Sequence, residues 1–132
     1  MKKLRGYIFS RAFMGERVPQ SIQNLVIREF CKRNNYLYLL SAAEYAMNDC
    51  SLVLKSIVNN TKGIKGIISY SLFQLPQDQE IRTNLLKKMI RKKIFFVSAA
   101  EQMFIKNQKD IEDINILWNI KKTLKHCPRD FK

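Results

Sequence analysis

The sequence predicts a doubly wound α/β domain with a mainly parallel four-stranded sheet and helices on both faces. Two observations support this fold. Four short apolar runs are rich in β-branched and aromatic residues, and a helical pattern separates each run from the next. Alternating strands and helices are typical of parallel sheets joined by right-handed crossovers. We expect the strand order 2-1-3-4 and one domain over residues 1–132, with a C-terminal helix at about 108–125.

The first strand is expected at Leu4–Ser10, followed by a loop that contains Gly15. A helix then begins at Pro19, because a missing N–H costs nothing at the first helical position. Apolar residues at helical spacing predict its buried stripe, which comprises Ile22, Leu25, Val26 and Phe30, with Ile27 on the flank.

The second strand is expected at Tyr36–Ala43. Asn48 and Asp49 are suitable caps for a helix from Cys50 to about Asn59. After a turn, the third strand is expected at Ile64–Ser71.

The third helix is expected from about Gln77 to Lys92, with Ile81, Leu85, Leu86, Met89 and Ile90 as its buried stripe. The fourth strand is Ile94–Ser98, and the last helix runs from about Gln108 to Lys125. Both helices begin with acidic residues and the last helix ends with lysines, which matches the helix dipole. Trp118 lies on the apolar stripe of the last helix, which is expected to pack on the sheet or on a partner.

Composition narrows the class of protein. The chain is 46% hydrophobic with only seven glycine and proline residues, so it is globular rather than disordered. No apolar stretch reaches the roughly 18 residues of a membrane helix, and the N-terminus does not resemble a signal peptide. We therefore expect a cytoplasmic protein without membrane insertion. Three cysteines and one histidine form no ligand cluster, so no metal or other cofactor is expected.

The formal net charge of +13 allows two interpretations. The densest basic run, Lys87 to Lys93, falls largely on one face of the third helix. Such a face can simply be solvated, or it can dock nucleic acid, a phosphorylated ligand or anionic lipid. The sequence leaves both interpretations open.

The candidate site lies at the carboxyl ends of the strands, where ligands of such sheets bind. In the order 2-1-3-4, the loop after strand one faces the end of strand three. The ligand-binding candidates are Tyr7, Arg11, Arg17, Gln20, Gln23, Tyr45, Tyr70, Ser71 and Gln74. Arg11 and Arg17 can present forked donors to a carboxylate or phosphate, while the other side chains can meet hydroxyl groups.

Ser10 and Glu44 are the catalytic candidates. Glu44 ends the second strand and can act as a base or orient a ligand hydroxyl; alternatively it pairs with an arginine or a helix terminus and only holds loops. Glu101, in the repeated sequence Ser-Ala-Ala-Glu, has the same two interpretations and favours the structural one. Ser10 would need activation by an arginine or a glutamate. GxGxxG, P-loop and GxSxG motifs are absent from the sequence.

The segment Tyr7-Ile-Phe-Ser-Arg, the helix start Gln20-Ser-Ile-Gln-Asn and the order of elements over about 100 residues resemble the catalytic domain of serine recombinases. That family opens with Tyr-x-Arg-x-Ser on its first strand. Phe9 stands where the family has arginine, and Arg11 stands where it has the nucleophilic serine, with Ser10 one place early. The resemblance therefore implies a resolvase-like three-layer fold without DNA cleavage.

Three longer strings resemble small proteins encoded in sporadically distributed bacterial carbohydrate gene clusters. They are RGYIFSRAFMGERVPQSIQNLVIR, LLSAAEYAM and SYSLFQLP. This resemblance implies a role in surface-carbohydrate biosynthesis and, with the strand-end residues, a small sugar or sugar-phosphate ligand. Two alternatives stay open: a nucleic-acid-binding protein of weak specificity that uses the basic helix, and a non-enzymatic scaffold that forms a homo-oligomer through the C-terminal helix.

Overall fold

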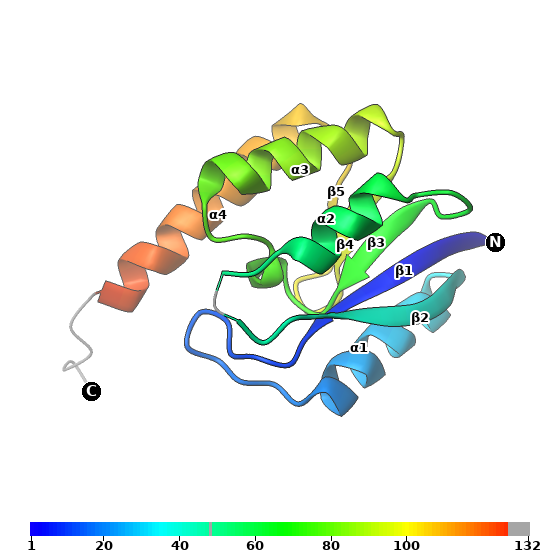
Figure 1. Ribbon diagram of the computed structural model, residues 1–132, viewed down its shortest axis with the longest axis horizontal. Coiled ribbons are helices and arrows are strands. Elements are labelled where there is room, and N and C mark those ends of the chain that lie inside the picture. The colour runs from blue at the N-terminus through cyan, green and yellow to red at the C-terminus, as the bar shows by residue number, and fades with distance from the viewer. Residues whose placement is uncertain (48, 127–132) are drawn as a thin grey trace.

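Five strands form one mixed sheet in the order β2-β1-β3-β4-β5 (Figure 1). A computed structural model describes residues 1–47 and 49–126, with the backbone alone at 124–126. The strands are β1 (Lys2–Phe9), β2 (Tyr36–Glu44), β3 (Gly66–Ser69), β4 (Phe95–Ser98) and β5 (Met103–Ile105). The helices are α1 (Gln20–Arg33), α2 (Leu52–Asn59), the 3-10 turn η1 (Leu72–Gln74), α3 (Gln79–Arg91) and α4 (Gln108–His126).

The predicted arrangement of the first four strands is confirmed. β1 pairs in parallel with both β2 and β3, and β3 pairs in parallel with β4. The predicted number of strands is wrong, because β5 adds a fifth strand antiparallel to β4. β5 has only three residues, which is too short for its side-chain alternation to be recognised in the sequence.

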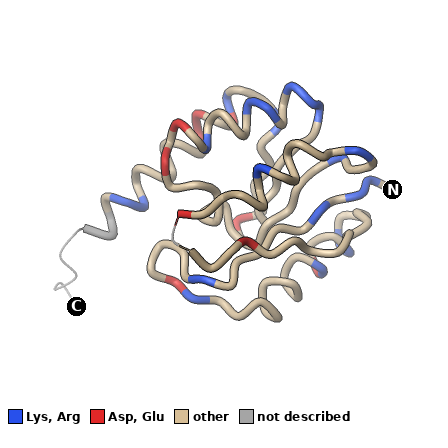
Figure 2. The backbone as a smooth tube through the Cα atoms, in the orientation of Figure 1, with Lys and Arg blue, Asp and Glu red and all other residues tan. Residues whose placement is uncertain are grey.

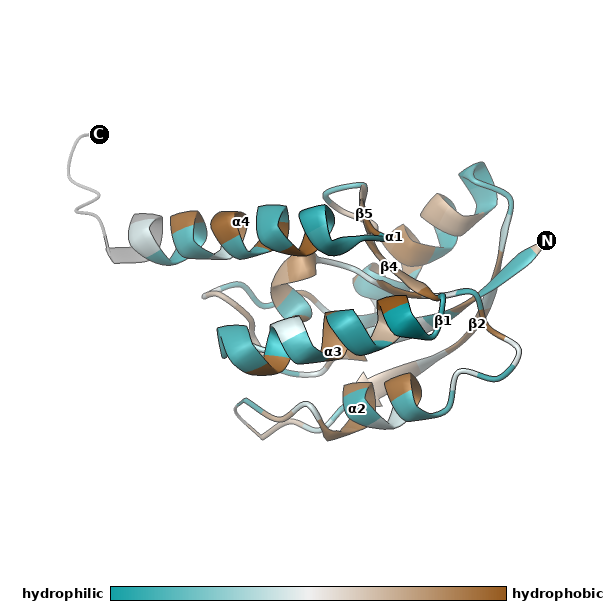
Figure 3. Ribbon diagram, turned by 90° about the horizontal axis from the view of Figure 1, so that it is seen from above, coloured by the Kyte–Doolittle hydropathy of each residue, from teal (hydrophilic) through white to brown (hydrophobic). Residues whose placement is uncertain are grey.

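Helices cover both faces of the sheet and bury two separate cores. On one face, Tyr7 and Phe9 of β1 pack with residues of α2, α3 and α4, including Leu54, Leu86 and Trp118. On the other face, Leu4 and Ile8 pack with residues of α1 and of the neighbouring strands. Hydrophilic and hydrophobic residues alternate along α3 and α4 (Figure 3), as expected for helices with one buried side.

The buried face of α1 differs from the prediction. Its buried residues are Gln23, Ile27, Phe30 and Cys31, while Ile22 and Leu25 are 44% and 58% exposed. The helix is turned because Gln23 faces inward to bond to the backbone of β1. The side chains of Ile22 and Leu25 are consequently left largely in solvent.

Helix α3 also buries a residue that the apolar pattern did not indicate. Arg82 is only 1% exposed, whereas Ile81 is 39% exposed. The guanidinium of Arg82 lies 4.5 Å from the Trp118 ring centre, and its Nε and Nη2 donate to Asn115 Oδ1. Burial lowers the pKa of Arg82 to about 10, although Asp78 partly offsets this effect. Trp118 itself is 1% exposed, so it belongs to the core of the chain rather than to an open surface.

Two glycines in the central strands make room for aromatic rings. A Cβ atom on Gly6 of β1 would lie 2.5 Å from Cε1 of Tyr38, and one on Gly66 of β3 would lie 2.8 Å from the Phe95 ring. Tyr38 and Phe95 both pack against the core beneath α1. The Tyr38 side chain of β2 therefore lies over Gly6 of β1, and the Phe95 side chain of β4 lies over Gly66 of β3.

Candidate functional site

A small cavity of about 270 Å³ lies beyond the carboxyl end of β1. Its walls come from the end of β1 and the following loop, from the loop before α2, and from the segment around η1. The lining residues are Tyr7, Phe9, Arg11, Ala12, Phe13, Asp49, Cys50, Ser51, Phe73, Gln74, Leu75, Pro76 and Gln77. The cavity thus lies at the edge of the sheet that strand topology predicts for a ligand.

Arg11 is the half-buried cation of this cavity. Its Nη1 donates to Tyr45 O at 2.7 Å and its Nη2 donates to Cys50 O at 2.9 Å. The guanidinium carbon lies 4.1 Å from the ring centre of Phe9. Arg11 therefore fastens the loop before α2 to the end of β1. Because a guanidinium carries five N–H donors, donors beyond these two bonds are left for a ligand.

Glu44 lies behind the cavity wall and is 2% exposed. Its carboxylate accepts from Tyr7 Oη at 2.8 Å, Tyr45 N at 3.0 Å, and Val53 N and Leu54 N at the start of α2. Cys50 Sγ lies 3.5 Å from its Oε2. Ser51, at the N-cap position of α2, makes no side-chain capping bond, so the carboxylate of Glu44 caps this helix from β2.

The environment of Glu44 fixes the protonation of two groups. Burial by itself would raise the pKa of Glu44, but the bonds from Val53 N, Tyr7 Oη, Tyr45 N and Leu54 N lower it below its usual value. Burial and the adjacent Glu44 carboxylate raise the pKa of Tyr7. At neutral pH the pair is therefore a carboxylate with a neutral phenol that donates to it.

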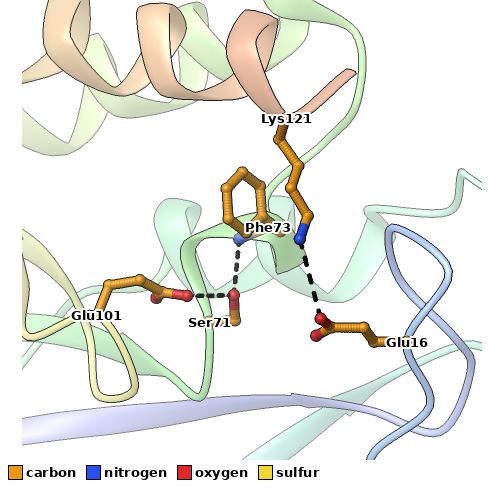
Figure 4. Close-up of polar contacts among 5 residues, drawn as sticks. All are labelled: Glu16, Ser71, Phe73, Glu101 and Lys121. Atoms are coloured by element: carbon orange, nitrogen blue, oxygen red, sulfur yellow. Dashed lines mark hydrogen bonds and ion pairs between the residues drawn. The ribbon is translucent and has the colours of Figure 1, made fainter. Parts of the chain in front are cut away.

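Glu101 performs a similar task on the opposite wall. Its Oε2 accepts from Ser71 Oγ at 2.8 Å and its Oε1 accepts from Leu72 N at 2.9 Å, while Phe73 N donates to Ser71 Oγ at 3.2 Å (Figure 4). The backbone N–H of Ser71 also donates to Gln74 Oε1 at 3.0 Å, which completes a capping box at η1. The two Ser-Ala-Ala-Glu sequences thus each supply a carboxylate that caps a neighbouring segment.

Two buried glutamines join the walls. Gln74 Nε2 donates to Gln23 Oε1 at 2.7 Å, and the same oxygen accepts from Phe9 N at 3.0 Å. Gln23 Nε2 donates to Phe9 O and to Val18 O, both at 2.8 Å. The ends of β1 and β3 are therefore linked through α1, as their predicted adjacency requires.

Lys121 of α4 lies near the same loops (Figure 4). Its Nζ is 3.9 Å from a carboxylate oxygen of Glu16 and 5.4 Å from the ring centre of Phe73. This contact connects the loop after β1 to α4 across the η1 segment.

The structure brings only some of the predicted residues together. Of these, Tyr7, Arg11 and Gln74 line the cavity, while Gln23, Glu44 and Ser71 support its walls. Ser10, Arg17 and Tyr45 are exposed and do not line it. Gln20 lines a separate groove beside β2, and Tyr70 packs against Phe13 with ring centres 6.2 Å apart.

Several lining residues were not predicted from the sequence. Cys50 and Ser51 were assigned to the first turn of a helix that begins only at Leu52. Asp49 was expected to cap that helix but is exposed, with a φ of 58°; Asn48 lies outside the described residues.

Within the described part of the chain, no group of three or more His, Cys, Asp or Glu side chains is placed to hold a metal ion. None of the helices described is both long and apolar enough to cross a bilayer.

Solved structures of recombinases share this fold. The N-terminal catalytic domain of TP901-1 integrase superposes with a TM-score of 0.64 at 16% sequence identity, over 92% of this chain and 96% of that one. A resolvase family site-specific recombinase from Streptococcus pneumoniae gives 0.60 at 12% identity, over 92% and 89%. No protein-family model and no curated protein sequence matches the chain. At these identities the likeness shows the fold: a resolvase-like α/β domain with a mixed, mainly parallel five-stranded sheet and four helices.

Proposed function

We propose that this domain binds a small polar or anionic ligand of sugar type, such as a sugar phosphate, in the cavity beside Arg11. The observation that carries the proposal is a half-buried guanidinium, held by two carbonyl groups, at the edge of a small cavity lined by Ser51, Gln74 and Gln77. A volume of about 270 Å³ is slightly below the roughly 300 Å³ at which the usual range of ligand sites begins, which favours a ligand of monosaccharide size.

The pathway part of the proposal rests on sequence resemblance. The strings that resemble carbohydrate gene-cluster proteins run from Arg5 to Arg28, Leu39 to Met47, and Ser69 to Pro76, and each contributes residues to the cavity or its support. A role in surface-carbohydrate biosynthesis would supply a ligand with hydroxyl groups and an anionic group. Glu44 already accepts bonds from several donors, so we assign it to positioning the loop before α2 rather than to proton transfer.

Substitution of Arg11 tests this proposal. Titrating the protein with glucose 1-phosphate, glucuronate and glucose, while following backbone amide resonances by NMR, should shift the amides of residues 49–51, 74, 75 and 77 with at least one anionic probe. Arg11→Lys keeps the charge but loses the forked donors and should weaken binding about 10- to 100-fold.

Arg17→Lys is the matched control, because Arg17 is exposed and outside the cavity. It should leave the titration unchanged. Since Arg11 also holds a loop, Ser51→Ala provides a second lining variant that breaks none of the Arg11 bonds. An absence of shifts with all three probes, or equal losses for Arg11→Lys and Arg17→Lys, would remove the proposed site.

A second candidate function, nucleic-acid binding, is favoured by the distribution of charge. Five segments adjoin one edge of the sheet, at the amino ends of β1–β4 and the carboxyl end of β5, and they contain no Asp or Glu. Their basic residues are Lys2, Lys3, Lys32, Arg33, Lys62, Lys65, Lys88, Arg91, Lys92, Lys93 and Lys106. We name this surface the basic edge. In Figure 2 it is the side of the molecule near the label N, where blue segments gather.

Helix dipoles account for part of the basic edge. Cations at the carboxyl ends of α1 and α3 are favourable there, and the acidic first turn of α4 offsets some of the charge. Lys2, Lys65 and Lys106 do not belong to the end of any helix, so the dipole gives no reason for them. Contact with the phosphate backbone of a nucleic acid would explain these three lysines.

Charge variants with equal net charge test this second function. In fluorescence anisotropy with a labelled 20-base-pair duplex, affinity should fall between 50 and 300 mM NaCl. The triple change Lys2→Gln, Lys65→Gln and Lys106→Gln should reduce the slope of log K against log salt by up to about three. The control Arg17→Gln, Arg28→Gln and Lys122→Gln removes the same charge elsewhere. Equal losses in both variants would mean that net charge, and not the basic edge, causes the binding.

A further inference from the structure

The outer edge of β2 is open to pairing with another strand. β2 is an end strand of the sheet and has nine residues, whereas the opposite end strand β5 has three. From Tyr36 to Ala43 it contains neither a charged residue nor a proline. Those residues are the usual protection of an exposed sheet edge. The outer edge of β2 therefore presents backbone donors and acceptors without a charged side chain or a proline beside them.

One irregularity limits how far a new ladder can extend. Arg5 pairs with Leu39 and Tyr7 pairs with Ala42, so two β2 residues, Leu40 and Ser41, lie opposite Gly6. Arg5 Nη1 donates to Leu40 O at 2.8 Å. This bulge bends the strand and leaves Leu40 86% exposed. The regular segment available to a partner is Tyr36–Leu39.

Large exposed apolar side chains concentrate around this edge. Of eleven such residues among those described, seven belong to α1, β2 or the segment from β2 to the start of α2. Leu37 and Leu40 lie on β2 itself, while Leu25 lies on α1. A groove of about 850 Å³ runs between α1 and β2, and Leu37, Leu40 and Asn24 are among its lining residues. Burial of this surface is a driving force for association.

We propose that two copies of this chain associate through β2, with the Tyr36–Leu39 segments antiparallel about a twofold axis. Each copy would then place Leu40 against the groove of the other, and the two sheets would continue into one. This interface is separate from the cavity beside Arg11 and from the nucleic-acid surface proposed above.

The distribution of charge favours the antiparallel over the parallel orientation of two copies. Each copy carries +13, and the basic edge lies at the amino end of β2. Antiparallel pairing places the two basic edges on opposite sides of the twofold axis, whereas parallel pairing would place them side by side. The uncharged strand itself adds no repulsion near the axis. An acidic partner, by contrast, would be attracted to the basic edge and not to β2.

The short opposite edge explains why association would stop at two copies. A head-to-tail arrangement of β2 on β5 would propagate into a filament. β5 offers only three residues and cannot match the length of β2. When β2 of one copy pairs with β2 of the other, the long edge of each sheet is covered. No second long edge then remains for a third copy.

Oligomeric state measured by sedimentation velocity tests the proposal. The wild-type chain at 10–500 µM should show a concentration-dependent dimer, tighter in 500 mM than in 50 mM NaCl because salt screens the repulsion of two cationic copies. Leu37→Lys and Leu40→Lys should each weaken the dimer at least 10-fold. Ile116→Lys, on α4 and 57% exposed in the wild type, is the matched control and should not.

Each outcome decides the proposal. A wild-type chain that is monomeric at 500 µM in both salts overturns it. A dimer lost in Ile116→Lys but kept in Leu40→Lys also overturns it, and assigns the interface to α4. Circular dichroism of the exposed-site variants confirms folding. If Leu37→Lys fails to fold, Leu40→Lys decides alone, because its side chain is already in solvent.

Discussion

Replacing Glu44 by glutamine is expected to lower the free energy of unfolding at pH 7 by about 3 kcal/mol. The amide keeps one acceptor oxygen, but its NH₂ group faces the N–H donors of the α2 terminus or the hydroxyl of Tyr7. Buried donors then lack acceptors, and the cap of α2 is lost. Urea denaturation followed by far-UV circular dichroism measures the effect.

The same substitution should change the dependence of stability on pH. The pKa of Glu44 is lowered by folding, so its carboxylate stabilises the protein above the unfolded value of about 4.5. That stabilisation is lost as the pH falls through the folded pKa. The difference in unfolding free energy between wild type and Glu44→Gln should therefore shrink below about pH 4.5.

Glu101→Gln is the matched control for both measurements. Glu101 has the same sequence context and also caps a segment, but it is only half-buried and accepts from two donors. Its substitution should cost about 1 kcal/mol. A free energy of unfolding of Glu44→Gln within about 0.5 kcal/mol of the wild-type value would show that Glu44 does not cap α2.

Replacing Gly66 by alanine is expected to destabilise the fold by about 3 kcal/mol. The new Cβ would lie 2.8 Å from the Phe95 ring and 2.9 Å from Phe95 O. Phe95 is 9% exposed and packs against Tyr36 and Phe104 with ring centres 5.9 and 5.6 Å away. Neither the ring nor the β4 backbone can withdraw without disturbing this cluster. Thermal unfolding by calorimetry measures the loss.

Gly6 offers a comparison in which the three nearest obstacles are side-chain atoms and none is backbone. A Cβ at Gly6 would meet Cε1 and Oη of Tyr38 and Oγ of Ser41. Adding Tyr38→Ala to Gly6→Ala should therefore cost less than the sum of the two single changes. Adding Phe95→Ala to Gly66→Ala should recover less, since Phe95 O remains 2.9 Å from the new Cβ. Strict additivity in both double variants would contradict the role given to the glycines.

The sequence predicted the frame of the site better than its details. The alternation of apolar runs and amphipathic segments placed strands one and three side by side, which Gln74 and Gln23 confirm through their hydrogen bond. Arg11 could be selected because it directly follows the first strand. Residues in the loop before α2 could not be selected in this way, because their position depends on the path of the chain between β2 and α2.

The main errors came from treating apolar spacing as sufficient. Gln23 and Arg82 are buried because they bond to backbone and side-chain oxygens far away in the sequence. A period of 3.6 residues gives no weight to such bonds, so the predicted stripes missed both residues, although Leu85, Leu86 and Met89 of α3 are buried as expected. Glu44 was open to two interpretations in the sequence; its bonds to the α2 backbone are those of a cap.

The length of β1 separates the two ends of this molecule in a useful way. Its eight residues, Lys2 to Phe9, span about 25 Å from the basic edge to the cavity. This is about three times the roughly 8 Å over which physiological salt screens exposed charge. A polyanion held at the basic edge would scarcely alter the potential felt by Arg11, and it would orient the domain with the cavity facing away from the polymer. Attachment at one end and ligand exchange at the other could then proceed independently in the same molecule.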